Sequence, residues 1–128
     1  MLQIILTAEK KFGRYASRAR AMLRFLGRLV KEKAAVEVHL VGNAVMNKNV
    51  LSYVSPRKFF RPDISGKALG EIYLNPTYIA AHGEDVDLML VHGFLHLLGY
   101  DHKRKSDRIK MEKKEDALLK QFYRSKSS

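Results

Sequence analysis

The hydrophobic positions of the chain follow two different periods. Short apolar runs rich in β-branched residues predict strands at Leu2–Thr7, Val36–Val41, Val50–Val54 and Leu69–Leu74. Apolar residues that recur every three or four positions predict helices at about Gly13–Lys33, Asp85–Leu98 and Ser106–Tyr123. The first strand is predicted to be an interior one, and residues 124–128 are expected to fray.

The order of these elements indicates how the strands pair. A strand, a helix and a strand in succession favour a right-handed crossover between parallel strands. The polar stretch 55–67 is typical of a long hairpin connection between the last two strands. We therefore expect residues 1–128 to form a single α+β domain, with a mixed sheet of about four strands packed with helices and a metal-bearing helix near the C-terminus.

Each predicted helix carries an apolar stripe that should face the core. The first stripe is Tyr15, Ala19, Met22, Leu26 and Leu29, the second is Leu88, Val91, Leu95 and Leu98, and the third is Met111, Leu118 and Phe122. The first helix also has a basic face, formed by Arg20, Arg24, Arg28 and Lys31, and Arg14 and Arg18 add to the positive charge of the helix. This face is either simply solvated or an RNA-facing surface, and the sequence leaves both interpretations open.

Composition narrows the classes of partner. The 128 residues include 24 Lys and Arg against 13 Asp and Glu, which gives a net charge of +11 and favours polyanionic partners. No apolar run reaches the roughly 18 residues that cross a bilayer, so we expect a cytoplasmic protein with no membrane partner. The chain has no cysteine, and a zinc site would have to use histidine, carboxylate and water.

The candidate chemistry is concentrated between residues 92 and 102. In a helix, His92 and His96 lie one turn apart on the same face, so both imidazoles can reach one ion. Gly99 can take the left-handed conformation that ends a helix and turns the chain so that His102 approaches the other two. Three neutral imidazoles and one water would form a tetrahedral site with an open position.

The same spacing occurs in metzincin zinc proteases, where a glutamate after the first histidine is the general base. Here that position is Gly93, which cannot accept a proton, so the pattern disfavours a peptidase. Asp101 could orient a ligand, accept a proton or bond to backbone, and the catalytic base stays unassigned. We interpret His39 as a strand-surface residue and His82 as a loop residue, neither of them a ligand.

Basic side chains near the histidines favour an RNA phosphodiester as the substrate, because a bound cation can also polarise a phosphoryl oxygen. Lys103 and Arg104 directly follow the third histidine. Arg57, Lys58 and Arg61 lie on either side of Phe59 and Phe60 in the hairpin connection, an arrangement that either contacts nucleic acid or pins the loop to the core. The candidate RNA-binding residues are Arg57, Arg61, Lys103 and Arg104.

Residues 91–102, with the sequence VHGFLHLLGYDH, resemble the H-G-x-L-H-L-x-G-Y-D-H signature of the YbeY family of rRNA maturation factors. Leu51–Tyr53 is similar to the family's V-L-S-F strand, Gly70–Ile72 to its G-D-I strand, and the glutamates after Met111 to its final helix. The resemblance implies one zinc ion per chain on His92, His96 and His102, with no other cofactor. It also implies a zinc-dependent, single-strand-specific endoribonuclease that acts in 16S rRNA 3′-end maturation and ribosome quality control, with ribosomal RNA and small-subunit components as partners.

The chain departs from this family in one segment. Between its second and third strands the family carries a segment like Y-R-x-K-D-x-x-T-D, whose arginine is associated with the active site. Here Gly42–Lys48 contains no arginine, and Asn49 stands where the aspartate is expected. We hypothesise that Arg57 and Arg61 compensate. The missing arginine favours an alternative, a ribosome-assembly RNA-binding module with a structural zinc and no catalysis, and a peptidase is the third hypothesis.

Overall fold

The computed structural model describes residues 2–56 and 66–127. The strands are β1 (Leu2–Ala8), β2 (Ala34–Leu40), β3 (Val50–Val54) and β4 (Lys67–Leu74). The helices are α1 (Gly13–Leu26), α2 (Pro76–Ala81), α3 (Val86–Leu97) and α4 (Lys105–Ser127), with short 3-10 turns at Lys10–Phe12 and Gly27–Leu29. None of the helices in the described ranges is long and apolar enough to cross a membrane.

The four strands form one mixed sheet in the order β1-β2-β4-β3. β1 and β4 both pair with β2 in parallel, and β3 pairs with β4 antiparallel. This confirms the α+β fold class, the parallel crossover and the hairpin pairing. The prediction that the first strand is interior is wrong, because β4 takes the second side of β2. The apolar run of β1 instead reflects packing of Leu2, Ile4 and Leu6 against the helix-covered core.

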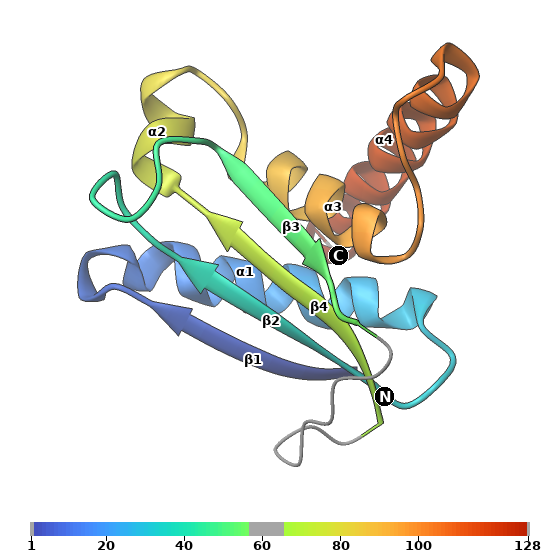
Figure 1. The fold of residues 1–128 in the computed structure, drawn as a ribbon, viewed down its shortest axis with the longest axis horizontal. Coiled ribbons are helices and arrows are strands. Elements are labelled where there is room, and N and C mark those ends of the chain that lie inside the picture. The colour runs from blue at the N-terminus through green and yellow to red at the C-terminus, as the bar shows by residue number, and fades with distance from the viewer. Residues whose placement is uncertain (1, 57–65, 128) are drawn as a thin grey trace.

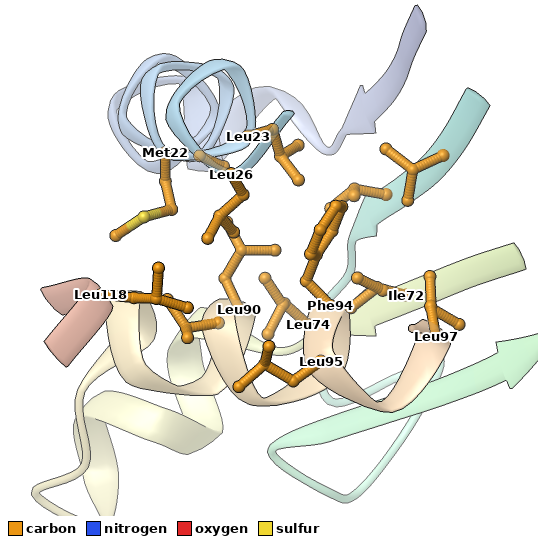
Figure 2. Packing of buried hydrophobic residues seen from close by; sticks show 14 of the residues in the cluster. Met22, Leu23, Leu26, Ile72, Leu74, Leu90, Phe94, Leu95, Leu97 and Leu118 are labelled. Carbon is orange, nitrogen blue, oxygen red and sulfur yellow. The ribbon is translucent and has the colours of Figure 1, made fainter. Parts of the chain in front are cut away.

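The helices cover one face of this sheet. Figure 1 shows α1 crossing behind the strands, and its contacts are with β1, whereas α3 packs on β3 and β4. Side chains from α1, α3, α4 and β4 meet in the core, as Figure 2 shows for Met22, Leu26, Ile72, Phe94 and Leu118. Alternate residues of the strands therefore face this core or the other side of the sheet.

Three details of the helices differ from the sequence prediction. α1 ends at Leu26 and continues only as a 3-10 turn, so Leu29 is half-buried, as is Tyr15. The stripe of α3 is shifted: Leu90, Val91, Phe94 and Leu95 are fully buried, while Leu88 and Leu98 lie at its margins. The prediction of a frayed C-terminus is wrong, because α4 continues to Ser127 and basic residues in its last turn suit the negative end of the helix dipole.

The short helix α2 was not predicted, although Asn75-Pro76 contains its start signal. The Asn75 side chain accepts a hydrogen bond from the Tyr78 N–H at 3.1 Å, and Pro76 occupies the first helical position. Asn75 is fully buried and also donates to Asn43 Oδ1 and to the Met46 carbonyl, both at 2.8 Å. It thereby joins the end of β4 to the segment that follows β2.

Candidate metal centre

The N-terminal end of α3 is fixed by a buried carboxylate. Asp85 caps the helix by accepting from the Asp87 N–H at 3.0 Å. Asp87 is 3% exposed and accepts from Arg18 Nε at 2.9 Å and Nη2 at 2.6 Å, and from the Tyr123 hydroxyl at 2.8 Å. This carboxylate ties α3 to both α1 and α4. Hydrogen bonding and the charge of Asp87 raise the pKa of Arg18, so this guanidinium of α1 is bound to α3.

Gly93 lets α3 lie close to the sheet between the first two histidines. A Cβ atom at this position would be 3.1 Å from Ile72 Cγ2 and 3.4 Å from Val50 Cγ2, on β4 and β3. The position where a metzincin has its general base therefore faces the packed core. The structure gives a packing reason for the glycine that the sequence showed only as a missing base.

The C-terminal end of α3 brings the third histidine back toward the other two. Gly99 has a φ of 104°, which favours glycine, and its N–H donates to the His96 carbonyl at 3.1 Å. The Tyr100 N–H donates to the Leu95 carbonyl at 3.0 Å. These two bonds form a Schellman motif, as the sequence predicted for a helix that ends at this glycine.

The three histidine rings converge beside this turn. His92 Nε2 and His96 Nε2 are 3.2 Å apart. The ring centroid of His102 lies 5.5 Å from that of His92 and 5.0 Å from that of His96. One ring nitrogen from each residue lies within 4.8 Å of the others, so the group could hold a metal ion. His92 and His96 are half-buried, whereas His102 is exposed and leaves one side of the group accessible.

Glu115 of α4 orients one of these rings. Its Oε2 lies 2.6 Å from His92 Nδ1, and the carboxylate is largely buried. The arrangement favours a proton on Nδ1 that is donated to Glu115, which leaves the lone pair of Nε2 directed at the other two imidazoles. Sequence analysis missed this contact. The signal was available, because Glu115 lies on the same helical face as Met111, Leu118 and Phe122.

The electrostatics at His96 favour a neutral imidazole. The pKa of His96 is lowered from its usual value, first by burial and then by the positive charge that His92 and His102 would carry. Deprotonation is what a metal ligand requires. The structure therefore supplies three ring nitrogens suited to a cation, with a carboxylate behind one of them.

The predicted RNA-binding residues fall in two places. Lys103 and Arg104 are exposed in the connection between α3 and α4, directly after His102. Arg57 and Arg61 lie outside the described residues. Asp101 accepts from the Lys103 N–H at 3.3 Å, which matches the backbone-bonding alternative for this residue.

The segment that lacks the family's arginine is short and tied down. It joins β2 to β3 through turn hydrogen bonds from the Val45 and Met46 N–H groups to the Gly42 carbonyl. The Gly42 N–H also donates to Glu9 Oε2 at 2.7 Å. At its end, Asn49 accepts from its neighbour's N–H and donates to Glu84 at 3.2 Å.

Two further histidines lie apart from this centre. His82 is an exposed residue at the C-terminal end of α2, where its ring stacks on Tyr78 with centroids 3.9 Å apart. His39 is on the surface of β2, as predicted, but it is grouped with Glu37 and Glu71, and these three residues could also hold a metal. Sequence analysis missed this second group, because it depends on the pairing of β2 with β4.

The fold and the triad define an α+β protein with three imidazoles at a helix end that could hold a metal ion. A family model described as Endoribonuclease YbeY matches residues 44–123. The Endoribonuclease YbeY of Anaeromyxobacter sp. (strain Fw109-5) is 31% identical over 140 aligned positions, which cover 93% of this chain and 71% of that protein. The chain therefore belongs to the YbeY endoribonuclease family.

Shorter matches concentrate on part of the chain. The Endoribonuclease YbeY of Anaplasma marginale (strain Florida) is 42% identical over 62 positions, covering 42% of this chain and 40% of that protein. That of Clostridium botulinum (strain Alaska E43 / Type E3) is 40% identical over 71 positions, covering 48% and 43%. Both identities exceed that of the longer match.

Proposed function

We propose that residues 1–128 act as a single metal-dependent hydrolase domain, a zinc-dependent, single-strand-specific endoribonuclease. The observation that carries this proposal is the convergence of His92, His96 and His102, each with a ring nitrogen within 4.8 Å of the others. Family membership supports RNA as the substrate, since the matching relatives are named endoribonucleases. The proposed role is 16S rRNA 3′-end maturation and ribosome quality control in the cytoplasm, with small-subunit components as partners.

The donor set of the three histidines fits one zinc ion. Three imidazoles are a ligand set that zinc uses in catalytic sites, where water completes the coordination. The pairing of His92 with Glu115 supports this fit, because metal-bound histidines usually donate their other N–H to a carboxylate or carbonyl. When bound, zinc would supply a Lewis acid that lowers the pKa of a water molecule and polarises a phosphoryl oxygen.

The residues of the chain then have distinct roles. Glu115 holds His92 in the tautomer that presents Nε2, and the glycine turn at Gly99 positions His102. The exposed Lys103 and Arg104 would neutralise RNA phosphates beside the accessible side of the triad. Arg57 and Arg61 are proposed to contact RNA from the hairpin connection, in place of the arginine that is absent from Gly42–Lys48.

One observation favours a second candidate function. The segment Gly42–Lys48 has no arginine and is held by backbone turns and by Asn75, so it offers no guanidinium group to a reacting phosphate. A ribosome-assembly RNA-binding module with a structural zinc would not need one. The two candidates differ in a single measurable property, which is cleavage of RNA.

The test uses the full chain, stripped of metal by a chelator and reloaded with zinc. Cleavage of a labelled single-stranded RNA would be compared between the wild type, His96→Ala and a matched His82→Ala control. RNA affinity would be measured on the same samples. The endoribonuclease proposal expects zinc-dependent cleavage by the wild type and His82→Ala, and none by His96→Ala.

The outcomes separate the two functions. Zinc-dependent RNA binding without cleavage by any variant would support the binding module and overturn the nuclease proposal. Equal cleavage by the wild type and His96→Ala would indicate a contaminating nuclease and would also overturn it. Double-stranded RNA of the same sequence tests the proposed single-strand specificity.

A further inference from the structure

The face of the sheet opposite the helices carries a second group of potential ligands. Val36, Val38 and Leu40 of β2 point into the core, so Glu37 and His39 point to the other face. Glu71 of β4 is the direct cross-strand partner of Glu37. The pairing of two interior strands thus brings two carboxylates and one imidazole together.

The two carboxylates of this group lie opposite each other on paired strands. Glu37 is 7% exposed, and its direct neighbour across the strand pair carries the same negative charge. Like charges directly opposite each other destabilise a sheet, and burial increases the cost. His39 lies between the two carboxylates, so the orientation of its ring decides how the three residues interact.

The ring of His39 is held in one orientation. Its Nδ1 contacts the Thr7 hydroxyl of β1, and its plane stacks on Tyr73 with centroids 4.9 Å apart. Nε2 consequently faces the carboxylates, 3.5 Å from Glu37 Oε2 and 3.8 Å from Glu71 Oε1. This nitrogen is buried and has no hydrogen-bond partner among the described residues.

The distances distinguish between a hydrogen bond and shared ligation. Charge-assisted N–H to O bonds are about 2.7–2.9 Å long, and both contacts of His39 Nε2 are longer. Two ligand atoms on one tetrahedral ion, each bonded at about 2.1 Å, are separated by about 3.4 Å. The observed 3.5 and 3.8 Å are close to this separation. The Thr7 hydroxyl can accept a hydrogen bond from Nδ1–H, and in this tautomer Nε2 carries a lone pair.

We propose that Glu37, His39 and Glu71 bind a divalent transition-metal ion, separate from the ion at the three-histidine centre. The three ligand atoms lie within 4.8 Å of one another. One imidazole and two carboxylates suit a borderline cation such as zinc, whereas calcium and magnesium prefer sites made only of oxygen. The ion would link β2 to β4.

The experiment measures metal stoichiometry and location on the full chain. Protein freed of metal by chelation is titrated with zinc, and bound metal is quantified after removal of excess. The wild type should bind two ions, and His92→Ala/His96→Ala should bind one at the sheet. Glu71→Gln and His39→Gln, which keep side-chain size, should each still bind one ion at the three-histidine centre. Their affinity for the ion at the sheet should be at least about 100-fold weaker than that of the wild type.

Cobalt in the His92→Ala/His96→Ala background locates the remaining ion. Paramagnetic shifts should appear on the ring protons of His39 and not on those of His82, the matched control. The proposal is overturned if the wild type binds one ion, or if His39→Gln and Glu71→Gln retain both with unchanged affinity. It is also overturned if these variants change only the pH dependence of stability, which would show that a protonated His39 alone bridges the carboxylates. Circular dichroism confirms that each variant is folded.

Discussion

The two histidine groups of this protein lie on opposite faces of one sheet and are built in different ways. At the helix end, three imidazoles face one another and the nearest carboxylate, Glu115, is one step behind His92. On the face of the sheet opposite the helices, a single imidazole lies between Glu37 and Glu71. The first group combines three ring nitrogens with an exposed side, and the second combines one ring nitrogen with two carboxylates. The same residue type is therefore placed in an accessible group in one region and between two paired strands in the other.

Removal of one histidine from the three-histidine centre should have the largest effect on only one of the two groups. His96→Ala should lower zinc affinity and RNA cleavage by more than about 100-fold, because a direct ligand contributes more than the groups that orient it. Zinc binding by calorimetry and cleavage of single-stranded RNA would measure both effects. His82→Ala is the control and should match the wild type. Retention of the full zinc stoichiometry by His96→Ala would contradict the assignment.

The carboxylate behind His92 gives a smaller expected effect. Glu115→Gln should weaken zinc binding by about 10- to 100-fold, because the amide no longer favours a proton on Nδ1 and a free lone pair on Nε2. Glu112→Gln on the exposed side of α4 is the matched control and should leave the affinity unchanged. Zinc competition with a coloured chelator gives both affinities. Equal affinities for the two variants would mean that Glu115 only packs against the ring.

The two regions also differ in how far the sequence predicted them. Local spacing is sufficient to predict the three-histidine centre, because the three histidines and the turn at Gly99 lie within one stretch of eleven residues. The group of Glu37, His39 and Glu71 depends on strand register, because Glu71 meets Glu37 only through the pairing of β2 with β4. A pattern along one strand places Glu37 and His39 on the same face but does not select the neighbouring strand.

The same distinction explains the errors in the fold. The strands, the parallel crossover and the mixed sheet follow from local periodicity and connection rules, and they were predicted correctly. The edge position of β1 and the burial of Asp87 depend on which elements become neighbours. Glu115 is intermediate, because its helical phase was readable but the identity of its partner required the docking of α4 on α3.

The packing of Gly93 offers a way to disturb one region and spare the other. Gly93→Ala should destabilise the protein by about 1–3 kcal/mol, because its Cβ would be 3.1 Å from Ile72 Cγ2 in a filled core. Gly13→Ala, with nothing within 4 Å of the added Cβ, is the control and should not destabilise. Urea unfolding measures both. A neutral Gly93→Ala would show that α3 can move away from the sheet without cost.

The smallest expected effect concerns the bond that fastens α4, and with it Glu115, to α3. Tyr123→Phe removes the hydroxyl that donates to Asp87 and should cost about 0.5–1.5 kcal/mol, measured by urea unfolding at neutral pH. The exposed Tyr53→Phe on β3 is the control.

The pH dependence of this bond supplies an independent check. Burial, followed by the hydrogen bond and charge of Asp87, raises the pKa of Tyr123 to about 12. The unfolded chain then loses this proton near pH 10 while the folded protein keeps it, so the unfolded state binds fewer protons in between. The stabilisation is fully present below pH 10 and is lost as the pH rises toward 12. Tyr123→Phe should lack this part of the decline, and an unchanged profile between the two proteins would show that the Tyr123 hydroxyl does not help to hold α4 on α3.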